Sequence, residues 1–116
     1  MQIQVNTDDN IRGDESLSEF VEAEVTKAIG RFSRRITRIE VHLGDENAAK
    51  HGAQDKRCLI EVRPAGRDPI AVTEHADTVR VALAGAIRKL RNILDSSLGR
   101  ETDHKGAPSI RQFAPD

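Results

Sequence analysis

The sequence predicts a two-layer α+β fold with the element order β-α-β-β-β-α, in which a four-stranded sheet carries two helices on one face. Three observations lead to this prediction. Four short segments alternate apolar and polar residues, as half-buried strands do. Two longer segments repeat apolar residues at intervals of three and four, which is typical of helices that cover a sheet. The length of 116 residues is enough for one domain with its own core.

The first strand and the first helix are predicted near the start of the chain. QIQVN, residues 2–6, places Ile3 and Val5 on one face of a strand. Further along, Ser16 and Glu19 have the spacing of a capping box, in which each side chain satisfies a free backbone donor at the start of a helix. We therefore expect a helix to begin there. Its apolar stripe comprises Leu17, Phe20, Val21, Val25, Ala28, Ile29 and Phe32.

Renewed alternation predicts the second strand. In RITRIEVHLG, residues 35–44, the apolar residues Ile39, Val41 and Leu43 fall on one face. Arg38, Glu40 and His42 fall on the other, which we expect to face solvent. The polar stretch that follows, residues 45–55, is expected to be a long flexible connection.

Two more strands complete the sheet. KRCLIEVRP, residues 56–64, is the predicted third strand, with Cys58, Ile60 and Val62 facing the core. AGRD then supplies turn residues, and PIAVTEH, residues 69–75, is the predicted fourth strand. Because each strand has one apolar and one polar face, we expect a single sheet with both helices packed on its apolar side.

The last helix is predicted from Ala76 to about Leu98. Asp77 or Thr78 is expected to cap its start, and Gly99 is a suitable stop. Its buried stripe comprises Val79, Ala82, Leu83, Ala86, Ile87, Leu90 and Leu94. We expect residues 1–98 to form one domain. Residues 99–116 contain two prolines and show no periodicity, so we expect them to be a flexible C-terminal tail.

Composition limits the possible classes of function. The 18 basic and 19 acidic residues give a formal net charge of -1, so overall charge does not by itself indicate a nucleic-acid partner. No apolar run reaches the roughly 20 residues that cross a bilayer, and the first residues lack signal-peptide features. We expect a cytoplasmic protein without a membrane partner. The single cysteine, Cys58, excludes an intrachain disulfide and a cysteine-based zinc cluster.

Local charge is distributed unevenly. At helical spacing, Arg80, Arg88 and Arg91 share one solvent-facing side of the last helix, with Lys89 beside its rim. A second basic cluster, at the end of the first helix and beyond, comprises Lys27, Arg31, Arg34, Arg35 and Arg38. If the helices lie side by side, we expect the clusters to form one basic face that binds RNA phosphates. The alternative is that the basic residues only complement the helix dipoles.

Several segments resemble one protein family. They are the opening MQIQV, the helix SLSEFVEAEVTKAIGRF followed by RRITRIEVHL, and the junction AVTEHADTVRVALAGAIRKL. Together with the order of elements, they resemble the ribosome hibernation-promoting factor and ribosome-associated inhibitor family, also called the sigma-54 modulation protein family. The resemblance covers residues 1–98 and corresponds to a short, single-domain form of the family.

The resemblance implies a function and a set of contacts. It implies a non-enzymatic stress protein that binds the small ribosomal subunit in the channel used by messenger and transfer RNA, and thereby inhibits translation. Family members contact ribosomal RNA through lysines and arginines of both helices. On this basis Lys89, in the matching RKL, is the first candidate contact and Lys27 the second. Asp95, Ser96 and Ser97 stand where relatives continue with lysines or histidines.

Other candidate sites are weaker. His42 and His51, with nearby Glu40, Asp45 and Glu46, show no recognised metal-ligand spacing, and we expect no metal and no cofactor. Cys58 is expected to be a small core residue. We find no catalytic constellation and expect no small-molecule substrate.

A second function stays open from the sequence. The alternative is a diverged family member without ribosome binding that acts as a protein-interaction or dimerisation module, which the near-neutral net charge favours. Steep weakening by salt would distinguish RNA binding from an apolar protein interface. The sequence does not indicate the oligomeric state.

Overall fold

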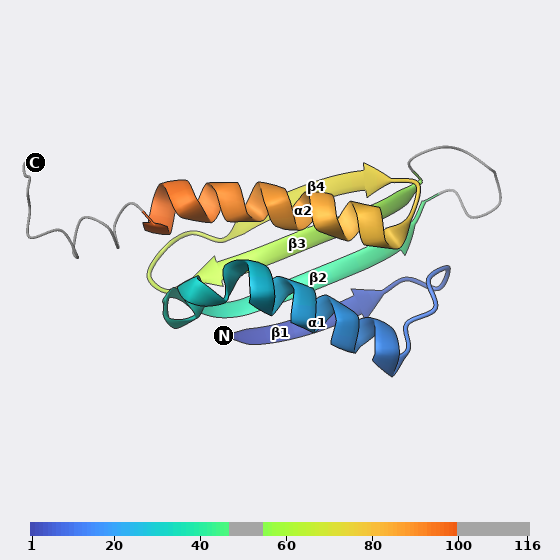
Figure 1. Ribbon diagram of the computed structural model, residues 1–116, viewed down its shortest axis with the longest axis horizontal. Coiled ribbons are helices and arrows are strands. Elements are labelled where there is room, and N and C mark those ends of the chain that lie inside the picture. Colours follow the sequence, from blue (N-terminus) through green and yellow to red (C-terminus); the bar gives the residue numbers. More distant parts are fainter. Residues whose placement is uncertain (47–54, 100–116) are drawn as a thin grey trace, which may run out of the picture.

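The computed structural model describes residues 1–46 and 55–99 and has two layers (Figure 1). A four-stranded sheet forms one layer, and two helices cover the same face of it. The predicted α+β class and element order are confirmed. The elements are β1 (Gln2–Thr7), α1 (Glu15–Ile29), the 3-10 helix η1 (Gly30–Arg35), β2 (Ile36–Asp45), β3 (Lys56–Pro64), β4 (Ile70–Ala76), α2 (Val79–Leu94) and the π-helical turn η2 (Asp95–Gly99).

The sheet is mixed and has the strand order β1-β2-β3-β4. β1 pairs with β2 in parallel, and the β2–β3 and β3–β4 pairs are antiparallel. The register places Val5 beside Val41, Val41 opposite Ile60, and Ile60 opposite Val72. Apolar residues of all four strands therefore share the face below the helices, because side chains alternate between faces with a period of two. The opposite face is called the outer face below.

The core lies between this sheet and the helices. Val25 and Ile29 of α1 and Leu83 and Leu90 of α2 are at most 2% exposed. Burying such a side chain contributes about 1.5–3 kcal/mol. The inward residues predicted for the second and third strands are buried as well, namely Ile39, Val41, Leu43, Cys58, Ile60 and Val62. Apolar periodicity therefore located the core correctly.

The predicted N-cap of the first helix is wrong. The backbone N–H of Leu17 donates to Asp14 Oδ1 at 2.9 Å, so Asp14 is the N-cap and the helix begins at Glu15. No capping box forms between Ser16 and Glu19, because both lie inside the helix. A carboxylate is favoured at this position, since it satisfies a free donor and its charge complements the helix dipole.

The ends of the last helix also differ from the prediction. Ala76 belongs to β4, where it pairs with Lys56. Thr78 caps α2, since the N–H of Val81 donates to its hydroxyl at 3.2 Å, which confirms one of the two predicted caps. The α-helix ends at Leu94, and the chain continues as the π-helical turn to Gly99.

Two expected loop features have different outcomes. The AGRD turn between β3 and β4 is confirmed, and its Gly66 has a positive φ of 72°, which side chains rarely adopt. Most of the predicted connection at 45–55 and of the predicted tail lies outside the described residues. In the part of the chain that is described, none of the helices has the length and apolar character needed to span a membrane.

Candidate nucleic-acid interface

The two helices lie side by side over the sheet and run in the same direction (Figure 1). In their first halves, the Arg80 guanidinium of α2 lies over the Phe20 ring of α1, 4.1 Å from its centroid. Beyond their C-terminal ends, the guanidinium of Arg31 in η1 forms an ion pair with the carboxylate of Asp95 in η2. These contacts join the two helical segments at two points, so the two basic clusters lie on neighbouring elements.

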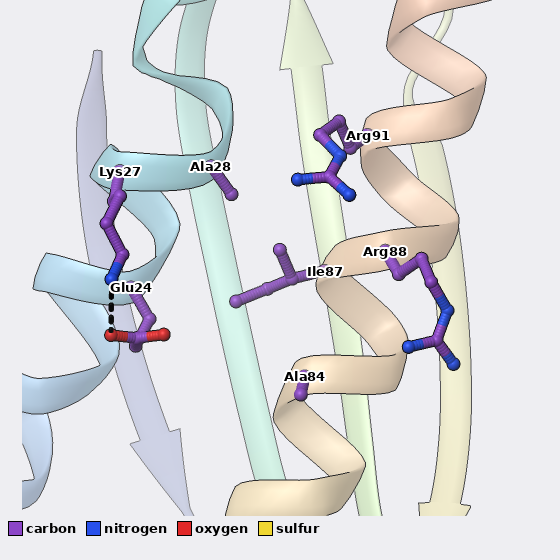
Figure 2. A pocket seen from close by; sticks show the side chains of 7 residues that line it. All are labelled: Glu24, Lys27, Ala28, Ala84, Ile87, Arg88 and Arg91. Carbon is purple, nitrogen blue, oxygen red and sulfur yellow. Dashed lines mark ion pairs between the residues drawn. The ribbon is translucent and has the colours of Figure 1, made fainter.

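A groove of about 270 Å³ separates the exposed sides of α1 and α2 (Figure 2). Its apolar wall is formed by Ile87 with the small side chains of Ala28 and Ala84. Charged side chains line the rest. We call this feature the helix groove; its full lining is Glu24, Lys27, Ala28, Ala84, Ile87, Arg88 and Arg91. It brings together residues of both predicted basic clusters.

The helix groove carries three cations and one carboxylate. Lys27 Nζ lies 3.8 Å from Glu24 Oε2, one turn earlier on α1, so the lysine charge is partly matched. Arg88 and Arg91 are exposed, and neither forms an ion pair within residues 1–46 and 55–99. Arg91 extends toward α1, whereas Arg88 extends toward the other side of α2 (Figure 2). Arg91 therefore adds positive charge to the groove itself, and Arg88 adds positive charge to the exposed surface beside it.

The basic residues after α1 are placed differently from one another. Arg31 is bound to Asp95, and its guanidinium also lies 4.5 Å from the ring centroid of Phe32. Arg34 is exposed on η1. Arg35 is half-buried, and its carbonyl accepts a hydrogen bond from the N–H of Ala65 at 2.8 Å. Arg38 lies on the outer face of the sheet, so it is not part of the helical face.

Lys89 lies on the flank of α2 that faces β4, away from the helix groove. Its Nζ donates to the Thr73 carbonyl at 2.8 Å and lies 2.6 Å from Glu74 Oε1. The hydrogen bond from Lys89 lowers the pKa of the Glu74 carboxyl. The side chain of Lys89 is 53% exposed, but its charge is matched by Glu74. The structure thus separates the first predicted contact residue from Arg91, whereas Arg88 is close enough to Glu74 for its charge also to lower the pKa of that carboxyl.

Sequence reasoning missed the contact between Glu74 and Gly85. Glu74 lies on the helix-covered face of β4, and Gly85 is a buried residue of α2. A Cβ at Gly85 would lie 2.7 Å from Cγ of Glu74. Glycine is therefore required for the carboxylate to pass α2 and reach Lys89. The only signal in the sequence was a glycine inside a helical pattern, which points to a close approach.

The other candidate residues from the sequence, a cysteine and two histidines, lie away from the helix groove or outside the described residues. Burial raises the pKa of the Cys58 thiol to about 12, so the thiol is protonated at neutral pH and serves as a core side chain. His75 Nε2 lies 3.0 Å from Glu46 Oε1 across the outer face. His51 lies outside the described residues.

The fold and the helix groove define a small α+β domain whose paired helices carry exposed arginines on their outer side. The family model described as Sigma 54 modulation protein / S30EA ribosomal protein matches residues 3–101, and the chain belongs to this family. The family predicted from the sequence, of ribosome-associated hibernation factors, is thereby confirmed. Its description names a modulation protein and a ribosomal protein, and no catalytic activity.

Solved structures share the fold. A ribosomal subunit interface protein from Coxiella burnetii has a TM-score of 0.65 and 18% identity, covering 85% of this chain and 99% of its own. The N-terminal domain of Thermus thermophilus Protein Y has a TM-score of 0.63 and 19% identity, covering 83% of this chain and 98% of its own. No curated protein matches the chain in a sequence comparison.

Proposed function

We propose that this protein is a translation inhibitor and hibernation factor that binds the small ribosomal subunit in the cytoplasm through the helix groove and the basic residues around it. The observation that carries the proposal is the pair Arg88 and Arg91, which are exposed and form no ion pair within the described residues. Membership in a ribosome-associated family supports the choice of partner.

The chemistry of the helix groove suits a structured RNA backbone. Arginine forms bidentate hydrogen bonds with phosphate oxygens, so Arg88 and Arg91 offer two such contacts about one helical turn apart. The protein has 3% aromatic residues, which is little for stacking on unpaired bases. Recognition through phosphates is therefore favoured over recognition of base sequence.

The remaining basic residues contribute unequally in this proposal. Arg34 is exposed and extends the surface beyond the helix groove. Lys27, Arg31 and Lys89 have to leave a carboxylate before they bind a phosphate, so each contributes less than Arg88 or Arg91. Arg80 is exposed, but its guanidinium already lies over the Phe20 ring, so it contributes less than a free arginine. Arg35 is half-buried and contributes least.

Co-sedimentation with isolated small ribosomal subunits across a salt series tests this proposal. We expect binding that weakens steeply with salt, because phosphate contacts release counterions. In the double variant Arg88→Glu/Arg91→Glu, binding should fall strongly, and the slope of log affinity against log salt should become shallower by about 2. The matched control is Arg57→Glu/Arg63→Glu, which reverses the same number of charges on the outer face of β3.

The outcomes separate the candidate functions. Weak binding by the groove variant and normal binding by the control would support the proposal. Equal losses in both variants would contradict the choice of the helix groove. An absence of binding by the natural chain, even at low salt, would contradict the ribosomal role and favour a protein-interaction or dimerisation module.

A further inference from the structure

The outer face of the sheet brings together three side chains that the proposed function does not use. Glu40 and His42 are two residues apart on β2 and therefore point to the same face. The β2–β3 register places Glu61 directly opposite Glu40. His42 Nε2 lies 3.0 Å from Glu61 Oε1 and 3.5 Å from Glu40 Oε1. One imidazole nitrogen thus faces two carboxylates.

This pairing favours positive charge, and Arg38 already supplies one beside Glu40 Oε2. Two carboxylates directly opposite each other on neighbouring strands repel and destabilise the sheet. The ligand atoms of Glu40, His42 and Glu61 lie within 4.8 Å of one another, so the space between them is where a cation interacts with all three. A proton on His42 supplies one positive charge, whereas a divalent cation supplies two.

We infer that Glu40, His42 and Glu61 form a surface site for Zn²⁺ or a similar first-row divalent ion. One imidazole nitrogen and two carboxylate oxygens are a ligand set that zinc accepts. Tetrahedral bonds of about 2.0–2.1 Å place ligand atoms about 3.3–3.4 Å apart. The observed separations of 3.0 and 3.5 Å from His42 Nε2 are close to this value, and all three ligand atoms lie within 4.8 Å of one another, so binding requires movements of side chains and not of the strands.

Neighbouring residues orient one of the ligands. Arg38 Nε lies 3.0 Å from Glu40 Oε2, and the Arg38 guanidinium also donates to the side chain of Gln4 on β1. Glu40 Oε2 is therefore held, and Oε1 is left to face His42. Such outer contacts fix the orientation of metal ligands. The positive charge of Arg38 lowers the affinity for a cation, so we expect weaker binding than in a buried structural zinc site.

The sequence did not reveal this cluster, because its third member comes from another strand. In the sequence, Glu40 and His42 are two residues apart, and this is not a recognised spacing of metal ligands. Glu61 joins them only through the antiparallel pairing of β2 with β3. A metal ion bound by all three would link these two central strands and stabilise their pairing.

Calorimetric titration of the chelator-treated full chain with Zn²⁺ tests the inference. The chain has four histidines, so each is changed to alanine in turn. We expect one ion per chain, with affinity lowered about tenfold or more in His42→Ala and in Glu61→Gln. His75→Ala is the matched control, because His75 also forms an ion pair with a glutamate, Glu46, but within residues 1–46 and 55–99 it pairs with that one carboxylate. His51→Ala and His104→Ala should also bind normally.

A second measurement guards against a folding artefact. The side chain of Glu61 is 50% exposed, so Glu61→Gln should fold, with a melting temperature close to that of the natural chain without metal. Added Zn²⁺ should raise the melting temperature of the natural chain and of His75→Ala clearly more than that of Glu61→Gln. Unchanged affinity in His42→Ala, or loss of binding in His75→Ala, would overturn the inference, as would no binding by the natural chain.

Discussion

The helix groove and the outer face of the sheet both carry arginines, but the two surfaces differ in how those charges are matched. On the outer face, Arg38 lies 3.0 Å from Glu40 and Arg57 lies 3.5 Å from Glu46, whereas Arg63 is exposed and forms no ion pair within the described residues. Beside the helix groove, neither Arg88 nor Arg91 forms an ion pair within the described residues, although the charge of Arg88 also lowers the pKa of the Glu74 carboxyl. A count of basic residues would rank the surfaces as similar. Pairing distinguishes Arg38 and Arg57 from Arg91, because an arginine already bound to a carboxylate must break that contact before it binds a phosphate.

The largest expected effect on stability concerns the core that lies between the helix groove and the outer face. Leu90 is fully buried between α2 and the sheet. We expect Leu90→Ala to lower the free energy of unfolding by about 2–5 kcal/mol, because it removes apolar contacts and leaves a cavity. Urea denaturation measures this change. The exposed Ile93→Ala is the control and should cost much less; similar losses in both would contradict the assigned core.

The next effect concerns the flank of α2 that faces β4. Gly85→Ala places a methyl group 2.7 Å from Cγ of Glu74, so we expect a loss of about 1–3 kcal/mol in unfolding free energy. In a Glu74→Ala background the collision is absent. There, Gly85→Ala should be neutral or stabilising by up to about 1 kcal/mol, because alanine favours helix. Urea denaturation of the four chains checks this change of sign, and equal losses in both backgrounds would contradict it.

The ion pair between Lys89 and Glu74, on the same flank of α2, should make stability depend on pH. Lys89 lowers the pKa of Glu74 from its ordinary value of 4.5, so the pair stabilises the fold above that pH. This contribution is lost as the pH falls through the lowered value. We expect the difference in unfolding free energy between the natural chain and Glu74→Gln to be largest near neutral pH and to shrink below pH 4.5. Denaturation at several pH values measures it, with the exposed Glu22→Gln as the control. A difference that stays constant with pH would contradict the assignment.

The smallest expected effect on stability concerns the ion pair between Arg31 and Asp95, which controls whether the Arg31 charge is matched. Asp95→Ala removes the partner of Arg31 on a solvent-exposed surface, where an ion pair contributes about 0–1 kcal/mol. The same change frees the Arg31 cation near the helix groove. We therefore expect nearly unchanged stability and tighter binding to small ribosomal subunits at low salt. Asp68→Ala, in the β3–β4 turn, is the control. Tighter binding in both variants would indicate a general effect of charge instead.

Part of the candidate site was predictable and part was not. Helical spacing placed Arg88 and Arg91 on the exposed surface of the last helix, and they lie there. It did not place Lys89 beside Glu74, because that contact depends on which side of α2 faces the edge strand β4. Nor did it predict the Arg31–Asp95 pair, since these residues are far apart in the chain. From the sequence, Asp95 is only an acidic residue at a position where relatives have a basic one. In the structure, its ion pair with Arg31 joins η2 to η1.

The sequence by itself determined the strands, the helices, the apolar face of each and the family. These properties follow from local periodicity and from patterns along the chain, because backbone geometry fixes which residues share a face. Tertiary structure alone decided which charges are matched and which are open, and it brought Glu61 to Glu40 and His42. The physical reason is that ion pairs act over a few ångströms in space, and the register of strands and the packing of helices set those distances.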